Sequence, residues 1–207
     1  MVSRCKFSLS VSPQACIYVA AVLLLIPLPW VVAWFVAAAV HELGHCLMVL
    51  ICGKGIERIE IGGQGAQIFT EPLTDIQTAL CAFAGSAGGL SLLFFASSFP
   101  RIAVCALLQS AFNLLPVFPL DGGRALCAIC RLLFSCKVAD KISSYVGNIV
   151  IWLFCFIGFV STVFWKLGIL PLAFSLFFLM HMKKIKKLAN KSVTGYNSAT
   201  KIEEVRL

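Results

Sequence analysis

The sequence predicts a mainly α-helical membrane protein: a polytopic bundle of about six transmembrane helices with a small membrane-associated β-hairpin. Composition is the first reason, because 60% of the 207 residues are hydrophobic, 13% are charged and the mean hydropathy is +0.95. The second reason is that the apolar residues form stretches long enough to cross a bilayer, which takes about 20 residues as a helix. Because spans and short connections use nearly the whole length, we expect no appended soluble domain.

The first expected span follows a short N-terminal segment, residues 1–14, and ends at Pro27-Leu28-Pro29 because proline cannot continue a helix. Arg4 and Lys6 precede it as in a signal peptide, but the prolines follow no small-residue cleavage site, so we expect the span to be retained. The six expected spans cover residues 15–29, 30–52, 75–99, 101–134, 142–164 and 167–181. They form a membrane core over residues 15–181, and a basic tail over residues 182–207 follows.

The second span carries the sequence His41-Glu42-Leu43-Gly44-His45. Residues four apart share one face of a helix, so both imidazoles can bind the same metal ion. Glu42 is then placed to take a proton from a metal-bound water. Apolar residues flank this sequence on both sides, which puts it at membrane depth. Charged groups there cost about 2.5 kcal/mol or more, so their presence indicates a functional site.

Residues 54–72, between the second and third spans, have the pattern of a β-hairpin. Apolar side chains such as Ile59 and Ile61 alternate with polar ones, and Gly62-Gly63-Gln64-Gly65 supplies a turn in the middle. A plain loop is the alternative interpretation. A hairpin beside a membrane site has an unpaired edge, to which an extended substrate can add as a strand.

The third span contains a run of small residues, Gly85-Ser86-Ala87-Gly88-Gly89. Small residues let helices approach closely in lipid, so packing is the favoured interpretation of this run. The alternative is that it leaves space for a substrate beside the metal.

The fourth span, residues 101–134, is interrupted. The stretch from Asn113 to Asp121 contains two prolines and is followed by two glycines, which excludes a continuous helix. Irregular backbone at membrane depth is tolerated where it is buried in protein or lines a cavity. We therefore expect Asn113 and Asp121 to face the metal site.

Hydrolytic zinc sites usually take three protein ligands and keep one position for water. The third histidine, His181, is interpreted as an interfacial residue, so the remaining ligand is expected to be a carboxylate. Of the nine acidic residues, Glu42 is the proposed base, and all others except Asp121 lie in loops, the hairpin or the tail. The predicted Zn²⁺ ligands are therefore His41, His45 and Asp121. Asn113 is predicted to donate a hydrogen bond to the substrate carbonyl or oxyanion, with capping of the broken helix as its alternative role.

The net charge of +8 would suggest a nucleic-acid partner in a soluble protein, but here it follows the expected topology. With six spans, both termini lie on one side, and only Arg101 and Lys166 among the basic residues fall on the other. The positive-inside rule then predicts a multi-pass cell-membrane protein with both termini in the cytoplasm and no nucleic-acid partner. The hairpin and the broken span lie on that same side.

The stretch His41-Glu-Leu-Gly-His45, together with Asn113-Leu-Leu-Pro-Val-Phe-Pro-Leu-Asp121-Gly-Gly, resembles the site-2 protease family of intramembrane zinc metalloproteases. The layout is most similar to the compact six-span branch that includes the stage IV sporulation protein FB. The resemblance covers roughly residues 15–181. It implies zinc bound by both histidines and Asp121, catalysis by Glu42, and an asparagine, Asn113, that opens the second motif. It also implies cleavage of membrane-anchored proteins within or next to their transmembrane segment.

The favoured hypothesis is thus a zinc metalloendopeptidase of regulated intramembrane proteolysis. Its expected partners are the lipid bilayer and a membrane-anchored protein substrate, with a regulatory membrane partner as a further possibility. A catalytically silent membrane chaperone or binding protein of the same fold is one alternative, against which the retained Glu42 argues. A metal transporter is another, but its polar residues would line a path through several spans, whereas here they converge on one point.

Overall fold

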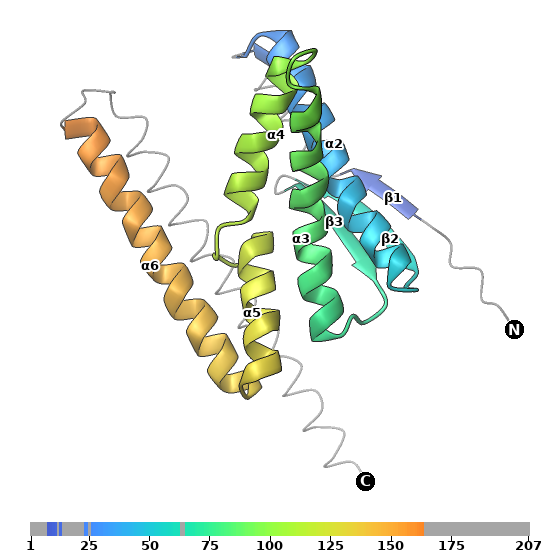
Figure 1. Cartoon of the computed structure of the whole chain (residues 1–207), viewed down its shortest axis with the longest axis vertical. Coiled ribbons are helices and arrows are strands. Elements are labelled where there is room, and N and C mark those ends of the chain that lie inside the picture. The colour runs from blue at the N-terminus through green and yellow to red at the C-terminus, as the bar shows by residue number, and fades with distance from the viewer. Residues whose placement is uncertain (1–7, 12, 14–22, 25, 63–64, 164–207) are drawn as a thin grey trace, which may run out of the picture.

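The computed structural model describes residues 8–11, 13, 23–24, 26–62 and 65–163 of the chain (Figure 1). In chain order its elements are β1 (Ser8–Val11), α2 (Leu28–Ile51), β2 (Ile56–Gly62), β3 (Gly65–Thr70), α3 (Asp75–Ser91), the 3-10 helix η1 (Leu92–Phe95), α4 (Pro100–Asn113), α5 (Asp121–Leu133) and α6 (Cys136–Val163). The fold is mainly helical with one small sheet, as the sequence predicts.

Three of the described helices are long and apolar enough to cross a membrane by length and composition: α2, α3 together with η1, and α6. The predicted break in the fourth span is confirmed, because α4 and α5 are separate helices of 14 and 13 residues that both pack against α3. The first and sixth expected spans, 15–29 and 167–181, lie largely or wholly outside the described residues. The count of six spans therefore stays a prediction.

Local chemistry explains where these helices begin. Pro29 stands in the first turn of α2, where the missing N–H of proline is not needed by the helix. Thr74 and Gln77 form a capping box at the start of α3. The Thr74 hydroxyl accepts a hydrogen bond from the Gln77 backbone N–H, and the Gln77 side chain accepts one from the Thr74 backbone N–H. Helix α6 begins at Cys136, earlier than the start predicted at residue 142. The prediction followed the apolar residues alone, whereas the helix also includes a polar first part, where Asp140 accepts a 2.8 Å hydrogen bond from Arg131 of α5.

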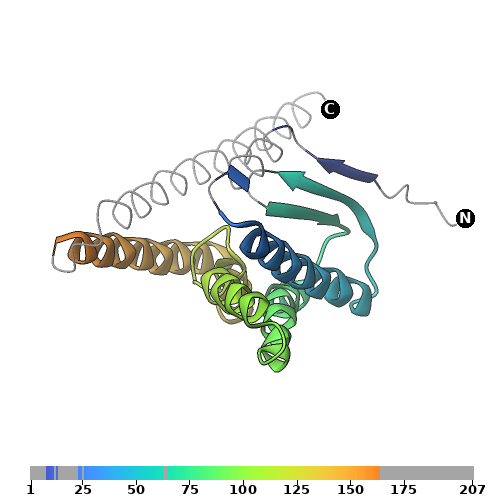
Figure 2. The ribbon, with the colours of Figure 1, turned by 90° about the horizontal axis from the view of Figure 1, so that it is seen from above.

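The predicted hairpin is confirmed as β2 and β3, which pair antiparallel with Ile59 opposite Ile68 and Gly62 opposite Gly65. The sequence prediction missed the third strand. Residues Ser8–Val11 were expected to be a plain N-terminal segment, but they form β1 and pair in parallel with the free edge of β2. A four-residue strand has too short a pattern to be recognised alone, and its partner lies about 50 residues further along the chain. Figure 2 shows the sheet lying alongside α2, outside the helices.

The helices pack through small side chains and expose large ones. Ala33 and Ala37 of α2 meet Cys105 and Ala106 of α4 in a fully buried cluster. Elsewhere on its surface, α2 presents large apolar residues to the surroundings: Trp30, Val32, Trp34, Phe35, Leu43, Leu47 and Leu50. This distribution reverses that of a soluble protein, where large apolar side chains fill the core, and it is typical of helices surrounded by lipid.

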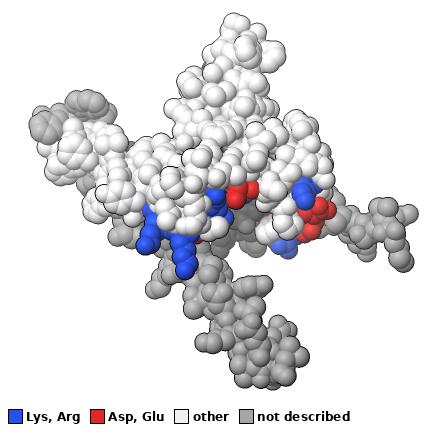
Figure 3. All heavy atoms as spheres, turned by 60° about the horizontal axis from the view of Figure 1, so that its bottom comes forward, with Lys and Arg blue, Asp and Glu red and all other residues white. Residues whose placement is uncertain are grey.

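Most of the lysine and arginine residues that the structure describes lie toward one end of the molecule. Figure 3 shows lysine and arginine atoms together at the end where α2 finishes and α3 begins, while the upper part of the visible surface carries none. The exposed basic residues at this end include Arg58, Arg131, Lys137 and Lys141. Arg124 lies one turn into α5, and Arg101 lies at the start of α4. An uncharged apolar belt next to a charged end is what a membrane protein needs, because ionised side chains are costly in the hydrocarbon layer.

Candidate metal centre

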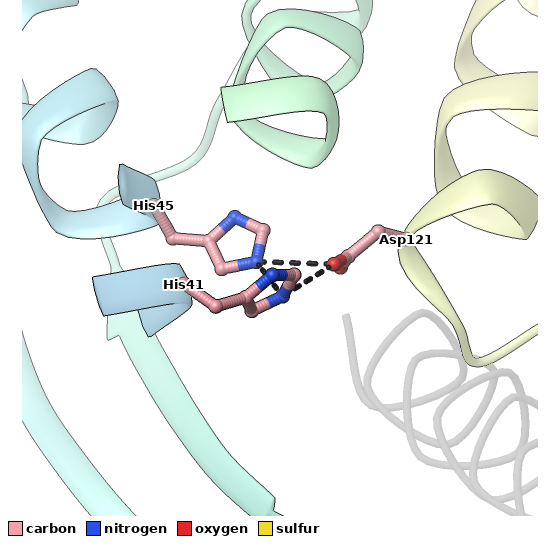
Figure 4. A group of neighbouring side chains, drawn as sticks. All are labelled: His41, His45 and Asp121. Atoms are coloured by element: carbon pink, nitrogen blue, oxygen red, sulfur yellow. Dashed lines mark hydrogen bonds and ion pairs between the residues drawn. The ribbon is translucent and has the colours of Figure 1, made fainter. Parts of the chain in front are cut away.

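His41 and His45 lie one turn apart on the inward face of α2, the same face that buries Ala37 and Val49. Their residues are only 4% and 8% exposed. The predicted sharing of one helix face is therefore confirmed, and the rings meet edge to face with their centroids 4.8 Å apart. Both imidazoles point away from the apolar outer surface of the helix toward α5 (Figure 4).

Asp121 reaches the histidines because the backbone breaks between α4 and α5. It is the first residue of α5 and is 8% exposed. The following glycines let the broken segment fold tightly against the start of α5. A Cβ atom on Gly122 would collide with the Leu114 carbonyl oxygen, and one on Gly123 would collide with the backbone of Val117 and Phe118. These backbone atoms cannot rotate away as a side chain can, so the two glycines fix the position of Asp121.

One oxygen of Asp121 and one nitrogen of each histidine form a compact triangle. Asp121 Oδ2 lies 3.0 Å from His41 Nε2 and 3.1 Å from His45 Nε2, and the two nitrogens are 3.1 Å apart (Figure 4). The structure thus brings together the three residues predicted as metal ligands, from α2 and from a helix that begins 76 residues after His45. Within the described residues, they are the group of histidine, cysteine and acidic side chains that could hold a metal ion.

The donor atoms fit a zinc ion in type and spacing. With bonds of about 2.0–2.1 Å, neighbouring ligand atoms around a tetrahedral zinc lie about 3.3 Å apart. Chemistry points the same way. His45 Nδ1 donates its proton to the Cys81 carbonyl oxygen at 2.8 Å, so a neutral His45 has a lone pair at Nε2. That lone pair faces the Asp121 oxygen, which is also an acceptor, and a cation between them removes the repulsion.

Helix α3 shapes the site through its small residues. A Cβ atom on Gly85 would occupy the position of the His45 imidazole, and one on Gly44 would lie against the Ala84 carbonyl oxygen. The run of small residues in α3 therefore allows close packing of α2 and α3, which was the favoured interpretation. The same close packing makes room for His45 and brings the Cys81 carbonyl oxygen within hydrogen-bond distance of its ring.

The two other predicted site residues border this triangle. Asn113, the last residue of α4, places its Nδ2 atom 3.1 Å from His41 Nε2. Glu42 follows His41 on α2 and is half-buried beside the triangle. The catalytic roles assigned to Glu42 and Asn113 stay predictions. His181 lies outside the described residues.

Sequence reasoning missed the groups that support the histidines. Cys81 takes part through its backbone oxygen, which carries no signal in the sequence. Ser110 lies next to the site on α4 and is completely buried. Its position three residues before Asn113 puts it on the same helix face, so the helical period was a signal that could have found it.

The chain is also similar to known proteins. No family model matches the chain. A solved structure of a site-2 protease from Methanocaldococcus jannaschii superposes with a TM-score of 0.61, covering 89% of this chain and 93% of that one at 20% sequence identity. A curated relative, a zinc metalloprotease of the same organism, is 26% identical over 141 residues, which is 61% of this chain and 42% of the relative. The match thus spans less than half of that relative's length.

The chain therefore has the fold of a site-2 protease. The resemblance to that family, drawn from its two motifs, is confirmed by the structural and sequence comparisons. The narrower resemblance to the branch of the stage IV sporulation protein FB is not tested by them and stays a prediction.

Proposed function

We propose that this protein is an intramembrane zinc endopeptidase that cleaves membrane-anchored proteins within or next to their transmembrane segment. The observation that carries the proposal is the triangle of three buried ligand atoms, 3.0–3.1 Å apart, contributed by His41, His45 and Asp121. The fold shared with a site-2 protease and the relative named as a zinc metalloprotease support it. The large apolar side chains on the outside of the helices support a substrate that arrives through the lipid rather than from water.

Zinc, when bound, would supply a Lewis acid that polarises the scissile carbonyl and lowers the pKa of a water molecule to near 7. Glu42 would take a proton from the attacking water and deliver it to the leaving amine nitrogen. The Asn113 amide would donate a hydrogen bond to the carbonyl oxygen as it gains negative charge. Cys81 holds the ring of His45 in place through its carbonyl oxygen, so this residue need not reorient during the reaction.

The proposed setting is the cell membrane, with several passes and both termini in the cytoplasm. The basic residues at one end of the molecule support this orientation through the positive-inside rule. The substrate would be a single-span protein whose helix unwinds beside the site, since protease sites act on extended backbone. The free edge of β3, within the described part of the sheet, is available for an extended segment to pair with. A regulatory membrane partner would act by controlling access to the site.

Glu42→Gln is the variant that tests the proposal. In purified full-length protein it should retain about one zinc per chain, as wild type does, because Glu42 is not a ligand. Cleavage of a single-span reporter protein should fall by about 10²–10⁴-fold, the usual contribution of a general acid–base group. Zinc content is measured by elemental analysis and cleavage by gel assay. His41→Ala is the matched control that should lose zinc as well as cleavage.

Two outcomes would count against the proposal. Persistent cleavage by Glu42→Gln would overturn the assignment of the base, and absence of zinc from the wild-type protein would remove the site. Wild-type protein that binds zinc but leaves single-span proteins uncut would favour the silent membrane chaperone. For the natural substrate, membranes of cells with wild-type or Glu42→Gln protein are compared by proteomics for a single-span protein that accumulates uncut in the variant.

A further inference from the structure

The two candidate histidine ligands differ in how their second ring nitrogen is held. His45 Nδ1 donates to the Cys81 carbonyl oxygen at 2.8 Å. His41 Nδ1 is buried and has no hydrogen-bond partner among the described residues. A histidine that binds metal through Nε2 carries its proton on Nδ1, and such a proton is almost always donated to an acceptor that fixes the ring. His41 therefore needs an acceptor close to Nδ1.

Ser110 supplies a hydroxyl group on the Nδ1 side of this ring, since both atoms lie close to Gly89 of α3. It is fully buried on α4, and its Oγ atom likewise has no hydrogen-bond partner in the part of the chain that the structure describes. Other helical hydroxyl groups bond to the preceding turn instead. Ser161 donates to the Ile157 carbonyl at 2.7 Å, and Thr162 donates to the Gly158 carbonyl at 2.9 Å. A buried hydroxyl group without a hydrogen-bond partner costs free energy. The position of Ser110 beside the site therefore indicates a hydrogen-bond partner there.

The two unpaired groups lie against Gly89 of α3, whose missing side chain leaves room for them. A Cβ atom on Gly89 would lie 2.5 Å from Ser110 Oγ, 3.8 Å from His41 Nδ1 and 3.9 Å from the Ala106 carbonyl oxygen. A hydroxyl group can donate one hydrogen bond and accept two. Ser110 can thus donate to the Ala106 carbonyl oxygen while accepting from the histidine through one buried water, so that every polar group beside Gly89 is satisfied.

We propose that Ser110 is the positioning residue of His41: through one buried water, its hydroxyl group accepts the Nδ1 proton and keeps Nε2 free for the metal. This inference rests on the proposed zinc site. Asn113, one turn further along α4, borders Nε2 of the same ring. Helix α4 therefore borders both nitrogens of the His41 ring, with Ser110 on the Nδ1 side and Asn113 on the Nε2 side.

The test compares Ser110→Ala with Ser143→Ala in full-length protein purified in detergent. Ser143 is a suitable control, because it is a buried serine on α6, a helix that packs against α5. The zinc dissociation constant is measured by competition with a chromophoric chelator. Loss of a group that orients a ligand weakens metal binding by about 10–100-fold, so Ser110→Ala should show this loss. Ser143→Ala should bind zinc within about twofold of wild type.

Two further readouts separate positioning from a general loss of structure. The melting temperature of the metal-free protein should be unchanged in Ser110→Ala, while the rise in melting temperature on adding zinc should be smaller than in wild type. The visible spectrum of the cobalt-substituted protein should change in Ser110→Ala and stay as in wild type in Ser143→Ala. A second variant, Gly89→Ala, fills the same space from α3 and should weaken zinc binding in the same direction.

Zinc binding by Ser110→Ala equal to that of wild type would overturn the inference while leaving the zinc site in place. Equal weakening in Ser110→Ala and Ser143→Ala would also overturn it, because the effect would then come from core packing. Failure of wild-type protein to bind zinc would instead remove the proposed function on which the inference rests.

Discussion

His41, His45 and Asp121 are polar side chains buried among apolar helices, which is an expensive arrangement for a protein to maintain. Each of the three is less than a tenth exposed. A divalent ion held by these two imidazoles and this carboxylate would have half of its charge offset by Asp121, which would suit a site of low dielectric constant. The glycines of α3 leave room for the side chains of the site, and a substitution at one of them, Gly85, tests this role.

Gly85→Ala should disturb the site through His45. The added methyl group would occupy the position of the imidazole, and both rings and helices are too tightly packed to yield without cost. We expect a destabilisation of about 1–3 kcal/mol, typical of overpacking, and a zinc affinity at least tenfold weaker. Denaturant or detergent unfolding and chelator competition measure the two effects.

Gly147→Ala on α6 is the matched control. A Cβ atom there meets nothing closer than the Pro116 carbonyl oxygen at 3.4 Å, and alanine favours a helix over glycine by about 1 kcal/mol. Its stability should be equal or higher and its zinc affinity unchanged. Equal zinc affinities in the Gly85 and Gly147 variants would show that the space beside His45 does not matter.

At the scale of elements, α3 connects the sheet to the site. It begins immediately after the strand pair, carries the Cys81 carbonyl that holds His45, and supplies the glycines that face α2 and α4. Helix α5 depends on the break before it in a similar way. Val117 and Leu120 of the broken segment pack against Ile151 of α6, which anchors the segment that presents Asp121.

Thr74→Ala should loosen the start of α3. The substitution removes the side-chain acceptor of the Gln77 N–H and with it one half of the capping box. Loss of such an N-cap costs about 1 kcal/mol, and the effect should be largest in the first turn. Hydrogen exchange followed by mass spectrometry should show faster exchange at residues 75–78, with the site end of the helix unaffected.

Thr70→Ala is a suitable control, because its hydroxyl group bonds only to the neighbouring Glu71 carbonyl oxygen at the end of β3. Exchange in the first turn of α3 should then be as in wild type. If Thr74→Ala also leaves that exchange unchanged, the capping box contributes nothing to the helix.

For the whole molecule, the distribution of charge predicts an orientation in the membrane. Within the described residues, the basic side chains lie at the end that holds the start of α6, while Arg101 lies at the opposite end, at the start of α4. By the positive-inside rule, the end with most lysines and arginines faces the cytoplasm. The candidate metal centre lies between the two ends, where α5 begins.

Cysteine labelling in intact cells tests this orientation. In a variant that keeps only the exposed Cys136, a membrane-impermeant maleimide should react only after the cells are permeabilised. A second variant with Ser98→Cys alone, in the exposed connection between η1 and α4, should react in intact cells. The reverse pattern would place the basic end outside and overturn the predicted topology.

The sequence by itself determined the features that depend on local spacing and composition. The four-residue step between His41 and His45, the helix break before Asp121 and the alternation in β2 and β3 are all readable in short windows, and each predicted the correct element. The position of the histidines at membrane depth stays a prediction, drawn from the apolar residues that flank them on both sides.

Only the tertiary structure decided which groups meet. The contact between His41 and Asp121 joins positions 80 residues apart, and that between His45 and the Cys81 carbonyl joins positions 36 apart. Such contacts depend on how closely α2, α3 and α5 approach one another, which glycines without side chains permit. The pairing of β1 with β2 likewise joins segments 50 positions apart, and Ser110 is buried where α4 packs against α2 and α3. Sequence patterns report the face and the depth of a side chain, whereas its partner is set by the helices that pack against that face.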